Sequence, residues 1–402
     1  MFSCISQFVF RFREIFAMEN NLTIVDMPFE VLDLIFKELF NLKDKLQLAQ
    51  AHEKLGRAFS YHSRSDYRSL YPYARIRPEM WVVLVQECGA TIEEFSTSEI
   101  ENFPWNDLLA KAIEQHCPNL KSVKICVYDN NCDSVQSFLL NMSQSLTSVE
   151  LTLHIDDTKK IFDAMAKMTK LTKFTRKGIP NDEVYQIQKL TALEELVMDN
   201  NDRFNPNSPL YLLDICAPLK NLRSLTVLGS TILPSDKPHS MIWVNLEHLT
   251  IDFCQVLTEL PECPKLKTLH IVYSYCNIDG LLFRFILQNG RNLVKINENS
   301  RTHTPDGESL LQVLRSCPKL RTYSTPMQNF KIYQAYVPSI VEVLRENGVK
   351  REKPFHLIIN AHPKCKWLHQ SECVSGAMDT RPVEVQQHRS QIPWLTHQVV
   401  GA

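Results

Sequence analysis

The chain has 402 residues, of which 44% are hydrophobic and 22% are charged, proportions typical of a folded water-soluble protein. Its formal net charge of −1 leaves no basic excess to hold a nucleic-acid backbone, so nucleic-acid binding is not expected. The sequence contains only 10 glycines and neither GxGxxG nor GxxxxGK[ST], which argues against a phosphate-binding loop. No run reaches the roughly eighteen apolar residues of a membrane-spanning helix, so no membrane partner is expected.

Residues 1–23 are predicted to be an N-terminal extension. Their apolar run is short, carries Arg11 and Arg13, and has no positive charge before it, so it does not fit a secretory signal. Met18 is an alternative start of the chain. A helix lying on a membrane surface is a less favoured alternative for this segment.

Residues 24–62 are predicted to form three short helices. Asp26 and Pro28 suit a helix start, because an acidic side chain accepts from free N–H groups and proline lacks the N–H that would be unpaired there. The apolar residues that follow recur at helical spacing, namely Val31, Leu32, Ile35, Phe36 and Leu39. Asn41–Asp44 interrupts this helix, and Leu46 and Leu55 lie in the next two. So short a unit buries little surface of its own and is expected to need a partner.

A connector is predicted over residues 63–78, and a buried helix over 80–87. From residue 91 the chain repeats, and we expect a solenoid over residues 79–360. Each repeat opens on a leucine, and the steps between these leucines range from 20 to 29 residues with a mean of 25. The opening leucines are Leu120, Leu146, Leu171, Leu193, Leu222, Leu246, Leu266, Leu293 and Leu320.

The pattern within each repeat is L-x-x-L-x-L. All nine residues at its second apolar position are aliphatic or aromatic, and six of nine are apolar at the third. The three exceptions, Arg176, Glu298 and Thr325, are interpreted as degenerate repeats. Alternation of this kind predicts a short strand whose apolar side chains point into the solenoid, with helices between the strands. Ile92 and Phe95 indicate an earlier capping repeat, and a helix over 339–347 followed by a strand over 355–359 is the expected last one.

Two stretches are expected to loop out of the solenoid, residues 200–209 and 229–239, because both are rich in Pro, Ser, Asn and Asp. Residues 361–402 lose the repeat and are predicted to be a disordered tail.

The cysteines recur in one context rather than pairing. Four precede or nearly precede a proline and a leucine: Cys117, Cys216, Cys263 and Cys317. A residue type repeated at one position of an array is expected to be a small buried hydrophobe, not half of a disulfide. Reduced thiols favour a cytoplasmic or nuclear location.

Neither metal binding nor catalysis is expected. A set with metal-ligand spacing exists in the tail, at His362, Cys365, His369 and Cys373, but a chain rich in Cys and His produces such sets by chance. His248 and His270 fall on adjacent repeats near Asp252, yet the sequence has no G-x-S-x-G or similar nucleophile turn. We interpret these residues as a solvated binding surface, with no catalytic residue, metal or cofactor.

The concave face of the solenoid is the predicted substrate surface. It mixes charges of both signs with hydroxyl groups, which suits a folded protein better than a nucleic acid. The candidate residues are Glu150, Lys173, Glu195, Thr226, His248, Thr250 and His270.

The first segment resembles the F-box. It shares Met27-Pro28, Glu30-Val31-Leu32, Ile35-Phe36, Leu39, Asp44 and Leu46 with that motif, and departs from it over Gln50–Leu55, where the family usually has Val-Cys and an aromatic residue. With the repeats, the chain resembles the F-box/leucine-rich-repeat family over residues 24–360. This resemblance implies an α/β fold, with an N-terminal three-helix F-box-like unit before a leucine-rich-repeat solenoid.

The resemblance also implies a function. In that family the F-box binds a Skp-type adaptor, which connects it to a cullin–RING ubiquitin ligase, and the repeats bind the protein substrate for ubiquitination and proteasomal degradation. The adaptor-facing candidates are Pro28, Val31, Leu32, Ile35, Phe36 and Leu46, some of which must instead pack the small core. The chain is then a non-catalytic subunit of an SCF-type ligase. The alternative is a leucine-rich-repeat interaction scaffold with no ligase role.

Overall fold

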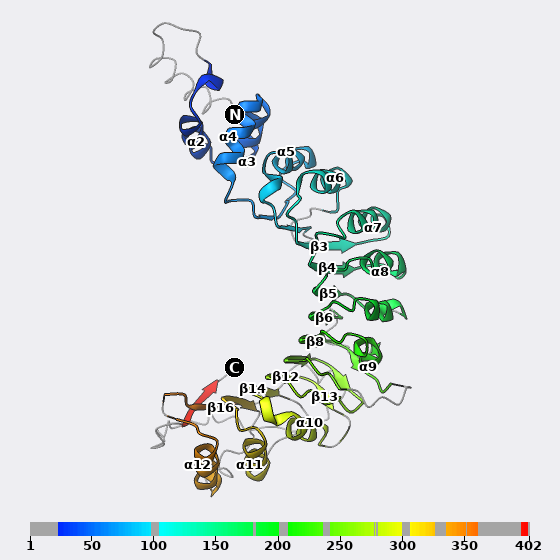
Figure 1. Ribbon diagram of the computed structural model, residues 1–402, viewed down its shortest axis with the longest axis vertical. Coiled ribbons are helices and arrows are strands. Elements are labelled where there is room, and N and C mark those ends of the chain that lie inside the picture. Colours follow the sequence, from blue (N-terminus) through cyan, green and yellow to red (C-terminus); the bar gives the residue numbers. More distant parts are fainter. Residues whose placement is uncertain are drawn as a thin grey trace, which may run out of the picture. The chain divides into compact units, whose positions relative to one another are not determined.

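The computed structural model describes residues 23–97, 104–179, 182–200, 208–235, 242–276, 278, 280–299, 306–325, 335–350, 352–360 and 395–400 (Figure 1). The chain divides into two compact units, Met1–Ser148 and Val149–Ala402. Each is described here by itself. The residues predicted as the N-terminal extension, apart from the last one, lie outside the described ranges.

The first unit begins with the three predicted helices, which pack around a small apolar core. A short 3-10 turn, η1 (Ile24–Asp26), precedes them, and the helices are α2 (Phe29–Glu38), α3 (Leu42–Gln50) and α4 (Glu53–Ser63). Pro28 precedes α2, and the Asn41 side chain caps α3 by accepting from the N–H of Lys43 at 3.0 Å. Phe36 and Phe59 pack ring against ring, with centroids 5.6 Å apart.

A polar link joins the same three helices. His62 of α4 lies 2.7 Å through Nδ1 from the Asp33 carboxylate of α2, and its Nε2 lies 3.0 Å from Nζ of Lys45 in α3. Since Lys45 can only donate, Nε2 accepts and Nδ1–H donates to Asp33. The His62 ring also stacks on Phe36 at 5.9 Å. The third helix therefore forms without the family residues missing from Gln50–Leu55.

The rest of the first unit contains the first repeats. Its remaining helices are α5 (Pro78–Cys88), η2 (Gly89–Thr91), α6 (Asp107–His116) and α7 (Cys132–Asn141), and its strands are β1 (Ser69–Leu70), β2 (Glu94–Ser96) and β3 (Ser122–Val127). The strands pair in parallel in that order. The helix predicted over 80–87 and the early capping repeat around Phe95 are confirmed. Strand β1 lies inside the stretch predicted as a connector, which therefore belongs to the sheet.

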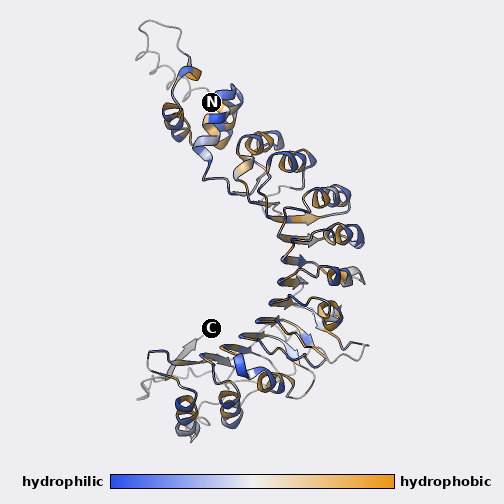
Figure 2. Cartoon of the chain, in the orientation of Figure 1, coloured by the Kyte–Doolittle hydropathy of each residue, from blue (hydrophilic) through white to orange (hydrophobic). Residues whose placement is uncertain are grey.

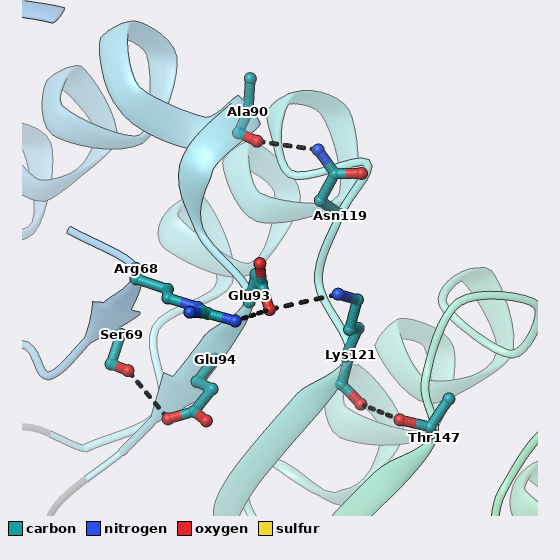
Figure 3. A network of polar contacts seen from close by, with 8 residues as sticks. All are labelled: Arg68, Ser69, Ala90, Glu93, Glu94, Asn119, Lys121 and Thr147. Carbon is teal, nitrogen blue, oxygen red and sulfur yellow. Dashed lines mark hydrogen bonds and ion pairs between the residues drawn. The ribbon is translucent and has the colours of Figure 1, made fainter. Parts of the chain in front are cut away.

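Charged side chains connect these three strands where each begins (Figure 3). The Glu93 carboxylate accepts from Arg68 at 2.9 Å and from Lys121 at 3.2 Å, so one acid joins residues that precede three successive strands. These hydrogen bonds hold the pKa of Glu93 below its ordinary value. Asn119 donates to the carbonyl of Ala90 at 2.8 Å in the same region.

The second unit is a solenoid of parallel strands. The strands of its main sheet are β4 (Ser148–Leu153), β5 (Lys173–Lys177), β6 (Glu195–Asp199), β8 (Ser224–Leu228), β10 (His248–Asp252), β12 (Thr268–Val272), β14 (Lys295–Asn299), β15 (Thr322–Thr325), β16 (Phe355–Asn360) and β17 (Leu395–Val400). The register advances by one repeat at each step, with Leu225 beside Leu249 and Leu249 beside Leu269.

Helices cover one face of this sheet, as Figure 1 shows. They are α8 (Lys159–Met165), η3 (Asp182–Lys189), α9 (Leu212–Cys216), α10 (Leu281–Asn289), η4 (Gly290–Asn292), α11 (Gly307–Ser316) and α12 (Val337–Glu346). Asp306 caps α11 by accepting from the N–H of Ser309 at 2.8 Å. Figure 2 shows hydrophilic and hydrophobic residues alternating along helices and strands alike, so each element has one face to bury. The fold is an α/β solenoid of the leucine-rich-repeat type.

Every position of the repeat pattern lies in the core. All nine opening leucines and all nine residues at the second apolar position are buried. The third position is buried as well, including Arg176, Glu298 and Thr325. The repeats interpreted as degenerate therefore keep their geometry, and polar groups occupy three inward positions.

Two of these inward polar groups have protein partners. Arg176 donates to the backbone carbonyls of Gly178 and Ile179, and burial lowers the pKa of its guanidinium to about 10, so it stays charged at neutral pH. The Glu298 carboxylate accepts from the buried hydroxyl of Tyr323 at 2.8 Å.

An asparagine ladder connects successive repeats. The residue before the opening leucine donates its amide to a backbone carbonyl of the preceding repeat at Asn221, Asn245 and Asn292, with distances of 3.1, 2.8 and 2.8 Å. Asn119 does the same in the first unit. The recurring Asn-Leu pair is the sequence feature that could have predicted this ladder, which the apolar pattern alone does not reveal.

The two predicted loops are partly wrong. Strand β7 (Pro209–Leu210) begins at the end of the first loop and β9 (Thr231–Ile232) lies inside the second. They form a second sheet with β11 (Gln255–Val256) and β13 (Tyr275–Cys276) of the following repeats, paired in parallel. The sequence did not predict these strands because two residues are too few to show alternation. Residues 201–207 and 236–241 lie outside the described ranges.

The last repeat is as predicted, with α12 followed by β16. Within the stretch predicted to be a disordered tail, the structure describes strand β17, which pairs in parallel with β16. The rest of that stretch lies outside the described residues.

The recurring cysteines are buried and free, as expected. Burial raises the pKa of Cys117, Cys263 and Cys317 to about 12, and that of Cys216 as well. These thiols are therefore protonated and unreactive at neutral pH.

Candidate binding surfaces

The first candidate surface lies on helix α2, on the side away from the three-helix core. Val31, Leu34 and Ile35 lie three and four residues apart and so share one side of the helix. Leu34 is 58% exposed, and Val31 and Ile35 are half-buried. Pro28 before the helix is exposed, and Phe40 beyond its end is 97% exposed. We call these five residues the α2 surface.

The structure divides the adaptor-facing candidates and corrects three of them. Leu32, Phe36 and Leu46 are completely buried in the three-helix core, so they cannot contact an adaptor while the unit is folded. Pro28, Val31 and Ile35 remain accessible. Spacing alone could not separate the groups, because residues on neighbouring sides of one helix share the same apolar period.

Two members of the α2 surface were missed from the sequence. Leu34 lies outside the predicted apolar stripe, and Phe40 lies directly before the break at Asn41, where it was not assigned to either helix. A large apolar residue off the stripe and another at a helix end are the signals that could have found them.

The second candidate surface is the sheet face of the second unit that carries no helices, called the open face below. All seven predicted substrate residues lie on it, at outward positions of the strands β4 to β12: Glu150, Lys173, Glu195, Thr226, His248, Thr250 and His270. Each is at least partly exposed.

Some of the charges on the open face pair with one another. Lys173 lies 3.0 Å from Glu195 on the next strand, and Lys177 lies 2.5 Å from Glu150. The part of the face around β4 to β6 is therefore close to neutral, and its ion pairs are exposed enough to exchange for contacts with a partner.

The two histidines lie on neighbouring strands but at different levels. His248 pairs in register with Thr268, and Thr250 pairs with His270. His270 accepts a hydrogen bond at Nδ1 from the Asn297 amide, at 2.9 Å. Burial lowers the pKa of His270, although Asp252 opposes this, so the imidazole is neutral at pH 7. A neutral imidazole bound by an amide on an open sheet suits recognition better than catalysis.

Among the described residues, no group of three or more His, Cys, Asp or Glu side chains is arranged to hold a metal ion. The tail set at His362, Cys365, His369 and Cys373 lies outside those residues. No helix in the described part of the chain has the length and apolar character needed to cross a bilayer.

Comparison with known proteins finds only distant structural likeness. No protein-family model matches the chain, and no curated protein sequence matches it. The yeast Rad7 and Elc1 complex is similar at 16% identity and a TM-score of 0.42, over 89% of this chain and 87% of that chain.

Two further solved structures are similar at the same level. An internalin from Listeria monocytogenes matches with 16% identity and a TM-score of 0.40, over 64% of this chain and 68% of that one. The mouse RP105/MD-1 complex matches with 15% identity and a TM-score of 0.37, over 69% and 57% of the two chains. Partners and activity do not follow from likenesses this distant.

Proposed function

We propose that this chain is the substrate-recognition subunit of an SCF-type ubiquitin ligase. The α2 surface carries the proposal, because it presents apolar side chains that the three-helix core does not use. Leu34 and Phe40 both leave large apolar groups in water on one short segment, which favours a surface that another protein covers. The F-box resemblance of the same helix supports a Skp-type adaptor as that protein.

The mechanism is proximity rather than catalysis. The adaptor connects the chain to a cullin–RING ligase, while the open face holds a protein substrate. Holding both raises the effective concentration of a substrate lysine near the conjugating enzyme. The chain needs no cofactor for this role. We place it in the cytoplasm or nucleus, and the seven buried free cysteines of the described residues support that location.

Charge substitutions on the α2 surface test the proposal. Leu34→Asp and Ile35→Asp introduce a carboxylate where an apolar contact is expected, and each should abolish co-purification with a Skp-type adaptor. The matched control is Leu108→Asp in α6, because Leu108 is 57% exposed and Leu34 is 58% exposed. The control should bind the adaptor like wild type.

Ile35 is half-buried, so Ile35→Asp could lose adaptor binding by unfolding the helices, and its folding must be checked. Leu34 is exposed, so loss of binding by Leu34→Asp is not explained by loss of folding. If Leu34→Asp and Ile35→Asp both bind the adaptor normally, the F-box assignment fails. The chain would then be a leucine-rich-repeat interaction protein without a ligase role.

A further inference from the structure

Several repeats of the second unit turn a corner directly after their strand, and the first residue of that corner is held by its backbone N–H. Gly229 donates its N–H to the carbonyl of Asp252, and Phe253 donates to Val272, at 3.0 and 3.1 Å. Tyr273 donates to Asn299 at 2.9 Å in the same way. The corner thus continues the hydrogen bonding of the parallel sheet and fixes the direction of the corner side chain.

The backbone at these corners is left-handed, which favours glycine. Gly178 and Gly229 have φ of 116° and 65°. Phe253 and Tyr273 occupy the same position in the next two repeats with φ of 53° and 51°. They are the only non-glycine residues with positive φ in the described part of the chain. An aromatic side chain is strained there, so these residues need a reason that backbone geometry does not provide.

Burial does not provide that reason. Tyr273 is 36% exposed and Phe253 is half-buried. The two rings stack with centroids 4.9 Å apart and planes inclined by 27°, forming a continuous aromatic surface across two repeats. Each ring belongs to the residue that directly follows a strand, β10 or β12, and the backbone N–H of that residue is bonded to the next strand.

The surroundings of the rings are apolar and acidic. Asp252 directly precedes Phe253 and lies between Leu228 and Val272 in the sheet register. No lysine or arginine occupies the last strand position or the corner in the repeats of β8, β10 and β12. Aromatic faces are electron-rich, and a carboxylate beside them adds negative charge, so the local chemistry complements a cation with a flat or apolar body.

We propose that Phe253 and Tyr273, with Asp252, form a docking site for an arginine side chain on a segment of the bound substrate protein. The guanidinium lies against the ring surface and within reach of the carboxylate, while the partly exposed Leu228 contacts apolar residues beside the arginine. The inference rests on the proposed function in assigning the segment to a substrate. It assigns the selection of that substrate to the corner that follows β10 and β12.

The first experiment selects ligands without assuming a sequence. A phage-displayed library of random short peptides is panned on the immobilised full chain, and the recovered peptides are titrated by fluorescence anisotropy. We expect peptides with arginine beside apolar residues. Replacing that arginine by citrulline, which keeps the shape and removes the charge, should weaken binding at least about tenfold.

The second experiment removes the aromatic rings by substituting glycine, the residue that other corners of this solenoid carry. The pair Phe253→Gly and Tyr273→Gly installs the residue found at the neighbouring corners, so folding is retained and the thermal midpoint does not fall. Peptide binding should weaken at least about tenfold, as it should in Asp252→Asn. The control is Tyr128→Ala, because Tyr128 follows β3 with a similar exposure of 37% and normal φ. It should bind the peptide like wild type.

Several outcomes overturn the inference. They are failure to enrich any peptide, enrichment of acidic or wholly apolar peptides, and binding that survives the glycine pair. Binding of a labelled single-stranded RNA that the glycine pair removes would instead assign the rings to base stacking. Dimerisation of wild type but not of the glycine pair would assign them to a second copy of the chain. Adaptor binding by the glycine pair should be normal, so a failure here is distinct from a failure of the proposed function.

Discussion

The polar link at His62 is the feature on which the α2 surface depends. Asp33 of α2, Lys45 of α3 and His62 of α4 connect the three helices by two hydrogen bonds. His62→Phe removes both hydrogen bonds and keeps an aromatic ring to stack on Phe36. We expect local opening of α2 to α4 to become easier, although the apolar core is unchanged.

The size of the effect follows from the exposure of the three groups. A hydrogen bond to a charged group contributes about 1.5–3 kcal/mol when buried. His62 is largely buried, but Asp33 is partly exposed and regains water once its partner is lost. Reducing the buried value for the solvent exposure of Asp33 leaves about 1–2 kcal/mol for the link. This free energy corresponds to about 5- to 30-fold faster exchange of the protected amides.

Hydrogen exchange of the full chain measures this directly, because it reports each helix separately. Peptides from α2, α3 and α4 should exchange faster in His62→Phe, and peptides from β10 and β12 should not change. Asp33→Ala alone should have a smaller effect in the same direction, because it removes only the hydrogen bond to Nδ1 of His62, and combining it with His62→Phe should add little. Unchanged exchange in the three helices, or full additivity of the two substitutions, would refute the reasoning.

Two further predictions concern space and charge in the repeats. Gly290→Ala should lower the free energy of unfolding by about 2 kcal/mol, because an added Cβ would lie 2.5 Å from a backbone carbonyl oxygen of the next repeat. Gly348→Ala should cost only about 1 kcal/mol in urea unfolding, since its φ of +69° is strained but nothing lies within 4 Å, and equal losses would contradict this. For Glu93, hydrogen bonds lower the pKa of the folded state, so their stabilisation is present above the ordinary value of 4.5 and is lost as the pH falls through the folded value. Exchange in β1 to β3, corrected for the intrinsic rate, should rise on acidification below pH 4.5 in wild type and stay flat in Glu93→Gln, and a parallel rise in both would exclude Glu93 as the cause.

The fold was predictable because every repeat of the solenoid has the same packing requirement. Every repeat must bury the same positions against its neighbours, so the L-x-x-L-x-L spacing reports both the strand and its register. Arg176 also occupies a buried position, although it breaks the apolar pattern, and its strand has the same geometry as the others. Pairing with the neighbouring repeats positions the strand there, and the buried guanidinium donates to the carbonyls of Gly178 and Ile179. The second sheet was missed because two-residue strands after a turn have no period to detect.

The α2 surface was predictable as a helix but not residue by residue. Phe36 and Ile35 are adjacent apolar residues on α2, yet one is completely buried and the other is half-buried. That difference depends on where α4 packs, which is a tertiary contact between segments about twenty residues apart. Phe40 shows the reverse case, since the sequence does not tell whether a phenylalanine at a helix end packs into the core or stays exposed.

The aromatic corner could not be found from the sequence for a related reason. Phe253 and Tyr273 look like ordinary apolar residues after a strand, and only the backbone shows that they occupy positions where Gly178 and Gly229 are unstrained. The α2 surface and this corner thus share one property: each places large apolar groups where neither the core nor the backbone of this chain requires them. In a repeat protein, whose core is explained by its period, such residues are where partner binding should be sought first.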